Sequence, residues 1–375
     1  MSKLTVETIR DIAGLEKLKT CWDELLATSE ADPVFGSYEW TRIWWQSHSA
    51  DNVDPFLLVF TLNKTVKGII GLYHTRAQQG PFTVHTIKSL GVPAADYYNF
   101  IIADEFKVEI INQFVENQIT QGDFDAIALR HIKSSSGNLA ELVRISKKNG
   151  LIAVIEQTEP CPYIRLEKTF EDYRQKQLNS RSRNMYSRKY KKLLALGEIR
   201  FEMVTDKAAI IKVLPEMAAL EDKSWKGPRQ VGIFASPEKR DFYFKVTEAL
   251  AEKEQVALHL LWHNARLLCY YFCFLLDDRL YFYNTAFDPE YSRFSPGSLS
   301  FLDLIKCCHE RRIIIIDMLR GGHDYKSGWA AQCTENINLH LFPPTIKGRI
   351  LALLFELRLN LRKLKRKFIG KKHEN

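Results

Sequence analysis

The sequence predicts an α/β (α+β) chain in which two similar units, each with a mixed central sheet, follow one another. Strand-like and helix-like patterns alternate along most of the 375 residues. Two hairpin turns, around Asn63 and Asn264, lie 201 residues apart and have similar strand patterns on both sides, which indicates a duplicated unit. Residues 279–330 read as strand, loop, helix and strand, an order that leaves free backbone N–H groups at the start of the helix.

The first half is expected to carry its elements in a regular order. Its aromatic second helix starts after Gly36, and Asn63-Lys64-Thr65 forms the hairpin turn. We expect helices at 15–28, 37–48, 106–120 and 138–148, and strands at 55–62, 66–75, 84–90, 98–102, 124–129 and 151–156. Pro160 and Pro162 then mark a boundary region.

The second half repeats this order. Gly197 is a natural helix stop, and His263-Asn264-Ala265 forms the second hairpin turn. We expect helices at 170–177, 180–196, 207–223, 237–253 and 299–310, and strands at 199–204, 256–262, 266–276, 279–285 and 313–317. The predicted domains are residues 1–165 and 166–345, followed by a basic amphipathic helix at 346–375, in keeping with the usual domain size.

Charge and cysteine content exclude several classes of protein. The net charge of +8 comes from residues 345–375, which hold ten Lys or Arg and two Glu, and the rest balances at 43 basic and 43 acidic residues. A neutral body argues against a broad nucleic-acid surface. The seven cysteines form no CxxC pair, the ten histidines show no ligand spacing, and no secretory or membrane-spanning segment is visible. We therefore expect no metal and a cytoplasmic protein.

The turn at 293–299 has the features of an anion site. Gly297 allows a phosphate to approach closely and tolerates positive φ, while Pro296 cannot donate a hydrogen bond. A helix start concentrates free N–H groups and positive potential at this turn. The alternative is an ordinary helix start with Ser295 as its cap and Pro296 in the first turn.

A set of short motifs carries a family resemblance. They are Asp288-Pro289-Glu290-Tyr291, Ser295-Pro296-Gly297, Asp317-Met318-Leu319-Arg320-Gly321 and Tyr325-Lys326-Ser327-Gly328-Trp329. Together they resemble the tandem GNAT acyltransferases of the CelD-like (BioF2-like) branch, which are distant relatives of the Fem-type peptidoglycan aminoacyl transferases. A looser likeness, at residues 35–40 and 96–100, extends the resemblance over most of the chain up to about residue 345.

The resemblance implies two tandem GNAT-like domains and acetyl-CoA or another acyl-CoA as co-substrate. Main-chain amides at the turn would hold its pyrophosphate, and Arg293 would add charge. The implied coenzyme-binding residues are Arg293, Phe294, Ser295, Gly297, Ser298 and Leu299. The usual Q/R-x-x-G-x-G/A signature is replaced here by Arg293-Phe-Ser-Pro-Gly-Ser, in which the second glycine is absent and the spacing differs.

The residues after the last strand of this segment are candidates for catalysis. Acyl transfer needs a base for the attacking group and an acid for the leaving group. His323 or Asp324 would serve as base, Tyr325 as acid, and Lys326 would steady an anionic intermediate or an acceptor phosphate. Fem-type relatives have a lysine that corresponds to Lys326. The alternative is a surface turn with a structural Asp317 and a helix-capping Asp324.

Acceptor-binding candidates lie in both halves. In the second half, Arg181, Asn184 and Arg188 share a basic helix, similar to one near the acceptor site of Fem-type relatives, that would suit an anionic acceptor. In the first half, Tyr38, Trp40 and Tyr98 offer rings and polar groups for a sugar. The alternatives are a solvated helix face and ordinary core packing.

The sequence leaves three candidate functions. The first is transfer of an acyl group, most simply acetyl, to an amine or hydroxyl of a glycan or cell-envelope precursor, with a role in exopolysaccharide synthesis implied by the resemblance. The second is Fem-type transfer from aminoacyl-tRNA, which the neutral body argues against. The third is a non-catalytic glycan-binding or scaffold protein.

The C-terminal segment has an apolar stripe among basic residues. The stripe is Ile346, Ile350, Leu353, Leu354, Leu357, Leu361, Leu364 and Phe368. A helix of this kind can lie on an anionic membrane. We expect its first half, up to Leu357, to pack on the protein, and residues 358–372 to touch the inner face of the membrane.

Overall fold

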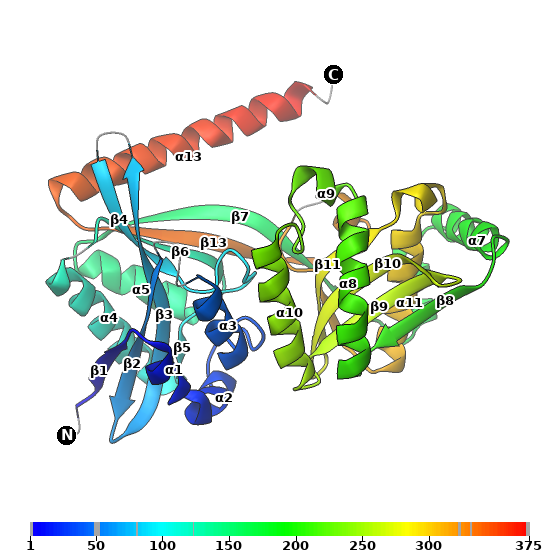
Figure 1. The fold of residues 1–375 in the computed structure, drawn as a ribbon. Coiled ribbons are helices and arrows are strands. Elements are labelled where there is room, and N and C mark those ends of the chain that lie inside the picture. The colour runs from blue at the N-terminus through cyan, green and yellow to red at the C-terminus, as the bar shows by residue number, and fades with distance from the viewer. Residues whose placement is uncertain are drawn as a thin grey trace. The chain divides into compact units, whose positions relative to one another are not determined.

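The computed structural model describes residues 3–48, 53–79, 82–122, 124–321, 324–330 and 332–372. The chain forms two compact units (Figure 1). Unit 1 comprises Met1–Glu159 and Glu335–Asn375, and unit 2 comprises Pro160–Thr334. The predicted mixed α/β class is confirmed.

Unit 1 is built on a mixed sheet. Its strand order is β1-β2-β3-β4-β6-β13-β7, with the short β5 beside β3. The strands are β1 (Thr5–Ile9), β2 (Asp54–Leu62), β3 (Thr65–Gln79), β4 (Phe82–Ser89), β5 (Ile101–Ile102), β6 (Ala126–Lys133), β7 (Ile152–Arg165) and β13 (Gln332–Phe342). β1 to β4 pair antiparallel in sequence, whereas β4 and β6 run parallel.

Helices cover both faces of this sheet (Figure 1). They are α1 (Ile12–Glu16), α2 (Lys19–Ala27), α3 (Tyr38–His48), η1 (Asp104–Phe106), α4 (Lys107–Gln121) and α5 (Gly137–Lys148). Trp44 of α3 packs on the ring of Tyr73. Ile110 of α4 lies against the opposite face of β3, where a side-chain carbon at Gly68 would come within 2.7 Å of it. The glycine therefore allows the helix to approach the sheet closely.

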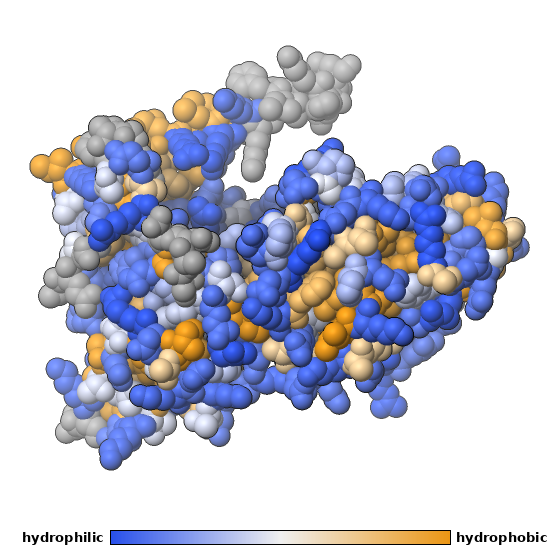
Figure 2. Space-filling model, in the orientation of Figure 1, coloured by the Kyte–Doolittle hydropathy of each residue, from blue (hydrophilic) through white to orange (hydrophobic). Residues whose placement is uncertain are grey.

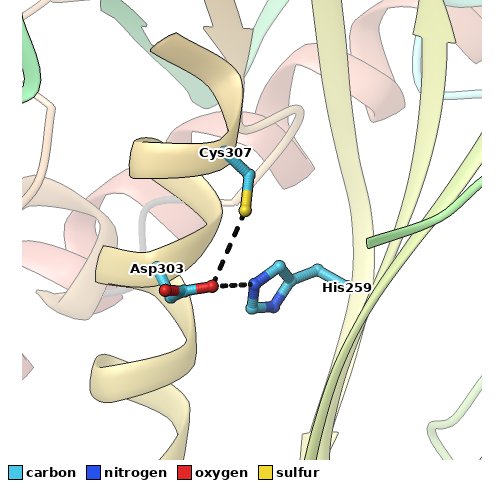
Figure 3. Close-up of side chains that lie close together, drawn as sticks. All are labelled: His259, Asp303 and Cys307. Atoms are coloured by element: carbon cyan, nitrogen blue, oxygen red, sulfur yellow. Dashed lines mark hydrogen bonds and ion pairs between the residues drawn. The ribbon is translucent and has the colours of Figure 1, made fainter. Parts of the chain in front are cut away.

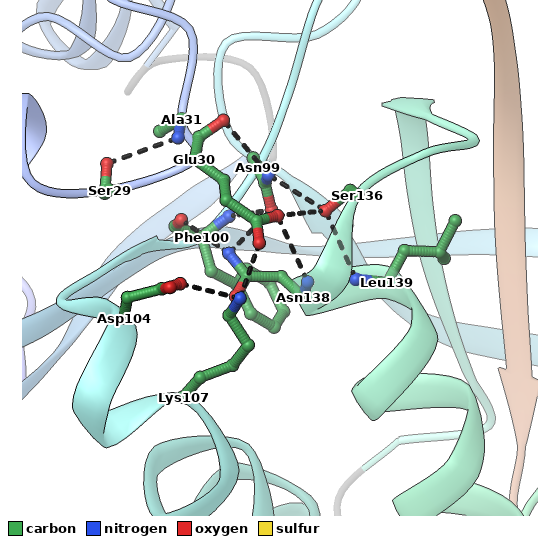
Figure 4. Close-up of polar contacts among 10 residues, drawn as sticks. All are labelled: Ser29, Glu30, Ala31, Asn99, Phe100, Asp104, Lys107, Ser136, Asn138 and Leu139. Atoms are coloured by element: carbon green, nitrogen blue, oxygen red, sulfur yellow. Dashed lines mark hydrogen bonds and ion pairs between the residues drawn. The ribbon is translucent and has the colours of Figure 1, made fainter.

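A polar network ties α2 and the following turn to α4 and α5 (Figure 4). Glu30 accepts hydrogen bonds from Ser136 Oγ at 2.9 Å and Asn138 N at 3.2 Å, and pairs with Lys107. Burial opposes its charge, but the bonds from Lys107, Ser136 and Asn138 together lower the pKa of Glu30. Asn99 also donates to Ser136 Oγ, at 3.1 Å. Asn99, whose neighbours in the sequence we considered for a binding role, is thus part of this network.

Unit 2 has the same architecture. Its strand order is β7-β12-β11-β10-β9-β8. The further strands are β8 (Ile199–Val204), β9 (Val256–His263), β10 (Arg266–Leu276), β11 (Arg279–Phe287) and β12 (Ile315–Asp317). The helices are α6 (Phe170–Gln177), α7 (Ser180–Leu194), α8 (Lys207–Lys223), α9 (Lys226–Arg229), α10 (Pro237–Ala251), η2 (Pro289–Phe294), α11 (Pro296–Glu310) and α12 (Asp324–Ser327). α8 and α10 cover one face of the sheet, and α11 covers the other (Figure 1).

The strand pairings confirm the predicted duplication. In unit 2, as in unit 1, three antiparallel pairings are followed by a helix and a parallel pairing, here between β11 and β12. The hairpin turns lie where they were predicted: Asn63 and Asn264 both adopt positive φ, as two-residue hairpin turns require.

The last strands of the two repeats are exchanged, and this corrects the predicted domain boundaries. The end of β7 pairs with β12 of unit 2 through Tyr163 to Arg165, and β13 pairs with β6 of unit 1 through Asn336 to Leu341. The chain therefore leaves unit 1 at Glu159 and returns to it at Glu335, instead of changing at 165 and 345. β13 was not predicted, because its partner strand β6 lies about 200 residues earlier in the chain.

The C-terminal helix α13 (Ile346–Lys372) belongs to unit 1. Leu351, Ala352 and Leu359 are buried in a cluster with Val84, Ala126, Val154 and Phe342. Lys347 pairs with Asp125 at 2.7 Å, and Arg362 lies 3.7 Å from Glu156. The His340 ring, whose Nε2 lies 3.7 Å from a Glu156 oxygen, is the largest of the influences that lower the pKa of Glu156 to about 2, so the carboxylate stays charged opposite Arg362.

The first half of α13 packs on the protein as predicted, but the face predicted to pack is wrong. Its apolar stripe does not pack up to Leu357: the side chains from Ile346 to Leu364 on that stripe are 42–82% exposed. A different face, carrying Leu351, Ala352, Phe355 and Leu359, docks on the protein. Phe368 lies in the part of the helix whose side chains are outside the described set. Among the described residues, no helix combines the length and apolar character needed to span a membrane.

Candidate functional site

A cavity of about 780 Å³ lies in unit 2, where α9, β10, β11, α11 and α12 meet. Its size is that of a site for a small molecule or cofactor. The predicted turn contributes Ser295, Pro296, Gly297 and Ser298, and the segment after β12 contributes Arg320, Tyr325, Lys326 and Trp329. The fold therefore brings two of the predicted clusters to one cavity. By contrast, a cavity lined by Tyr98 in unit 1 measures about 30 Å³, the size of a single water.

The turn forms a helix start with unoccupied amides. Leu299 N donates to Ser295 O at 3.1 Å, and Pro296 has no N–H. The amides of Gly297 and Ser298 are left as the free first-turn donors of α11, and both residues line the cavity. Tyr271 Oη donates to Gly297 O at 2.9 Å and holds the turn against β10. This geometry suits the binding of a phosphate.

Two details of the turn differ from the prediction. The positive φ, +53°, belongs to Ser295 and not to Gly297. The Ser295 side chain does not cap the helix, and Lys189 of α7 donates to its hydroxyl. The ordinary cap that we considered as the alternative is therefore absent, and the helix start keeps its donors and gains a cation beside them.

The remaining predicted coenzyme residues lie outside the cavity lining. Phe294 and Leu299 are buried in the core of unit 2. The Arg293 guanidinium lies 4.7 Å from the centre of the Phe294 ring. Of the six residues, the cavity is lined by Ser295, Gly297 and Ser298.

Besides Lys326, three basic side chains line the cavity, and two of them, Lys226 and Arg229, were not predicted. Both come from α9, and the third is Arg320, which follows β12. The Arg229 guanidinium stacks over the exposed ring of Trp225, 5.2 Å from its centre. Positive side chains beside free amides favour a polyanionic ligand such as a pyrophosphate.

Lys226 belongs to a buried polar cluster. Its ammonium donates to Asn284 Oδ1 and lies 3.5 Å from Glu221 Oε1. Glu221 is almost fully buried and accepts hydrogen bonds from Asn284, Tyr270 and the amide of Phe234. Burial lowers the pKa of Lys226, and the nearby Glu221 partly opposes this effect. Burial therefore makes the neutral form of Lys226 more accessible than that of an exposed lysine.

Tyr325 and Lys326 occupy different environments. Tyr325 has a half-exposed side chain that lines the cavity, and partial burial raises its pKa to about 12, so the phenol stays protonated at neutral pH. Lys326 is buried, and its ammonium donates to Met318 O at 2.6 Å and Arg320 O at 2.7 Å. Lys326 thereby holds the loop that carries Arg320. His323 lies outside the described residues, and for Asp324 only the backbone, at the start of α12, is described.

The motif aspartates have structural partners. Asp288 caps η2 by accepting from Glu290 N at 3.1 Å and also pairs with Arg266. Asp317 accepts from Leu319 N at 3.0 Å and pairs with Arg279 at 3.2 Å. A structural Asp317 was the alternative that we considered.

The predicted acceptor residues do not line the cavity. Arg181, Asn184 and Arg188 lie on the exposed face of α7. Tyr38, Trp40 and Tyr98 are at most 8% exposed and pack in the core of unit 1, where Tyr98 Oη donates to Gly71 O. Their burial leaves no ring face open to a sugar. Sequence reasoning missed Lys189, Lys226 and Arg229, because their separation from the turn along the chain hides their proximity.

Comparison with known proteins defines the class of this site. Residues 180–327 match the family model described as the acetyltransferase (GNAT) domain. This range includes the turn, α9, α11 and Tyr325, so the cavity belongs to a GNAT domain. This part of the chain is therefore similar to the acetyltransferase domains of the GNAT type. No curated protein matches the chain in sequence.

Solved structures share the fold over nearly the whole chain. FemX superposes with a TM-score of 0.59 at 12% identity, covering 92% of this chain and 99% of that one. The C-terminal domain of a putative lysylphosphatidylglycerol synthetase from Agrobacterium fabrum gives 0.54 at 12% identity, covering 92% and 95%. A conserved protein of unknown function from Bacteroides thetaiotaomicron gives 0.55 at 10% identity, covering 90% and 100%. The chain thus shares the fold of these proteins, FemX among them, over nearly its whole length.

Proposed function

We propose that this protein transfers an acyl group, most simply acetyl, from acyl-CoA to an amine or hydroxyl of a glycan or cell-envelope precursor. The observation that supports it is the cavity of unit 2, where the free amides of Gly297 and Ser298 lie with Lys226, Arg229 and Arg320. These groups fit the phosphates of coenzyme A. The resemblance to the CelD-like branch favours an acceptor in exopolysaccharide synthesis.

The chain offers named groups for each proton transfer. The nitrogen or oxygen of the acceptor attacks the thioester carbon, and the C–S bond breaks as the new C–N or C–O bond forms. Tyr325, protonated at neutral pH, would donate its proton to the departing thiolate. Lys226 in its neutral form would take the proton of the attacking group, and Glu221 and Asn284 would orient it. This role for Lys226 adds to His323 and Asp324, which we considered as bases from the sequence.

The proposal also includes a membrane contact through the basic C-terminal part of α13. Contact with an anionic bilayer would bring the enzyme to lipid-linked acceptors. Fem-type transfer from aminoacyl-tRNA stays the alternative donor chemistry, because the fold is shared with FemX.

We expect acetyl-CoA or a longer acyl-CoA to raise the melting temperature of the full-length protein, and deacylated tRNA to leave it unchanged. A ligand at 100 times its Kd stabilises a folded protein by about 2.7 kcal/mol. Thermal-shift titration with each ligand measures this. Stabilisation by tRNA alone would replace the proposal with the Fem-type alternative, and stabilisation by none of them would favour a non-catalytic role.

We expect Tyr325→Phe to lower kcat about 100-fold and to leave the KM for the donor nearly unchanged, since one positioned acid contributes roughly this much. Lys326→Ala should also raise the donor KM, because Lys326 holds the loop that carries Arg320 at the cavity. Thiol release from acetyl-CoA is measured with the best acceptor from a panel of amino sugars. Wild-type kcat in Tyr325→Phe would assign proton donation to another group.

A further inference from the structure

A second cluster of reactive side chains lies in unit 2 (Figure 3). His259 comes from β9, and Asp303 and Cys307 come from α11, one helical turn apart. Asp303 Oδ2 lies 2.9 Å from His259 Nε2 and 3.6 Å from Cys307 Sγ. The three potential ligand atoms all lie within 4.8 Å of one another. None of the three residues lines the cavity.

We propose that these three side chains bind a zinc ion. Imidazole nitrogen, carboxylate oxygen and thiolate sulfur are the ligand atoms that zinc takes in proteins. With zinc bonds of 2.0–2.3 Å, the edges of a tetrahedral site are about 3.3–3.7 Å long. The 3.6 Å separation of Asp303 and Cys307 already fits, and the 2.9 Å separation of Asp303 and His259 requires a few tenths of an ångström of movement.

The groups around His259 favour this arrangement. Its Nδ1 lies 3.0 Å from the hydroxyl of Ser300, which is fully buried one turn before Asp303 on α11. An Nδ1–H donated to that hydroxyl leaves the lone pair of Nε2 directed at Asp303, where a cation would relieve the repulsion between two acceptors. A fixed partner for the second ring nitrogen is the usual support of a histidine that binds a metal.

Access and charge also fit an ion. The His259 side chain is fully buried, whereas Asp303 is 26% exposed and Cys307 is half-buried. An ion can therefore enter from the Asp303 side and keep a water as its fourth ligand. A carboxylate and a thiolate neutralise the charge of Zn²⁺. Both elements that carry the ligands are packed in the core of the unit, so the site is held by rigid structure.

Zinc would join β9 to α11, the helix whose first turn provides the amides of the cavity. The ion would thereby link the two elements and steady α11. This inference does not depend on the proposed acyl transfer, and its test needs no activity measurement.

The test is metal binding by purified full-length protein. We expect about one zinc per chain after dialysis, and a cobalt-substituted protein with the thiolate-to-cobalt absorption band that only cysteine ligation produces. Cys307→Ser should remove the band, and both Cys307→Ser and Asp303→Asn should weaken zinc binding at least tenfold. Cys333→Ser, which changes an exposed thiol of unit 2, is the matched control and should behave as wild type.

Circular dichroism of each variant shows whether the fold is retained. Asp303→Asn keeps the shape of the side chain, so it serves if Cys307→Ser does not fold. Absence of zinc binding by the wild type, or equal affinities of wild type and a folded Asp303→Asn or Cys307→Ser variant, would overturn the proposal and leave the cluster as a hydrogen-bonded contact between β9 and α11.

Discussion

Gly297→Glu is expected to abolish binding of acyl-CoA to unit 2 while leaving the fold intact. A side-chain carbon at this position would lie 3.6 Å from the Phe287 ring and 3.9 Å from Tyr271 Oη, which are ordinary contact distances. The backbone of Gly297 does not need positive φ. The fold therefore tolerates a side chain here, and the carboxylate would extend toward the cavity.

The expected loss has an electrostatic cause. A carboxylate at the start of α11 would accept from the free amides of Gly297 and Ser298 and repel the phosphates that the same amides would bind. Calorimetric titration with acetyl-CoA should show a loss of affinity of at least about 100-fold, which corresponds to roughly 2.7 kcal/mol.

Two matched variants separate charge from bulk. Gly297→Gln has nearly the same size as Gly297→Glu without the charge, and Gly297→Ala adds only the side-chain carbon. We expect Gly297→Ala to bind with nearly wild-type affinity and Gly297→Gln to lie between the two. An unchanged Kd in folded Gly297→Glu would show that the coenzyme phosphates bind elsewhere.

The exposed stripe of α13 carries the second large expected effect. Its exposed members are Ile346, Ile350, Leu353, Leu354, Leu357, Leu361 and Leu364. Apolar side chains follow α13 on the surface of the protein (Figure 2). Basic residues 358, 362, 363 and 365 lie along the same helix. An apolar stripe of this length next to cations is complementary to an anionic bilayer.

We expect the full-length protein to cosediment with vesicles of phosphatidylglycerol and phosphatidylcholine at low salt, and less at high salt. The triple variant Leu353→Gln, Leu357→Gln, Leu361→Gln should bind at least tenfold more weakly at both salt concentrations. Lys363→Gln with Lys365→Gln should lose roughly 2 kcal/mol, or about 30-fold, and mainly at low salt.

Substitution is a sharper test than truncation. A chain that ends near residue 357 would lose Leu359 and Arg362, which hold α13 on unit 1, together with part of the stripe. The leucines of the triple variant are exposed, so the docking face stays intact. Equal binding by all three proteins would exclude a membrane role for the stripe. A stable dimer without lipid, which the triple variant abolishes, would assign the stripe to a second copy of the chain.

Local patterns in the sequence determined most helices and strands. α8, α6 and β8 have the predicted bounds, because apolar spacing and capping residues such as Asp206 act over a few residues. The duplication was visible because Asn63 and Asn264 both supply the positive φ that a hairpin turn needs. The turn at Ser295–Ser298 was predicted as part of a site, because a sequence that predicts where a helix starts also predicts where its free amides lie. Tyr325 was predicted as part of the same site.

Only the tertiary structure decided which distant residues meet. Lys189 contacts the turn and Lys226 lines its cavity from helices about 70 to 110 residues earlier, and His259 meets Asp303 across 44 residues. The exchange of β7 and β13 depends on which strand edges are available for pairing, and the local sequence does not predict this. In α13, two faces are apolar enough to pack, and the shape of the cluster around Val84, Ala126 and Val154 selects the face with Leu351 and Leu359. The sequence alone thus determined the helices and strands and the chemistry of the turn. The cavity, the exchanged strands and the exposed stripe depend on which distant surfaces pack together, because the packing energy is summed over many contacts.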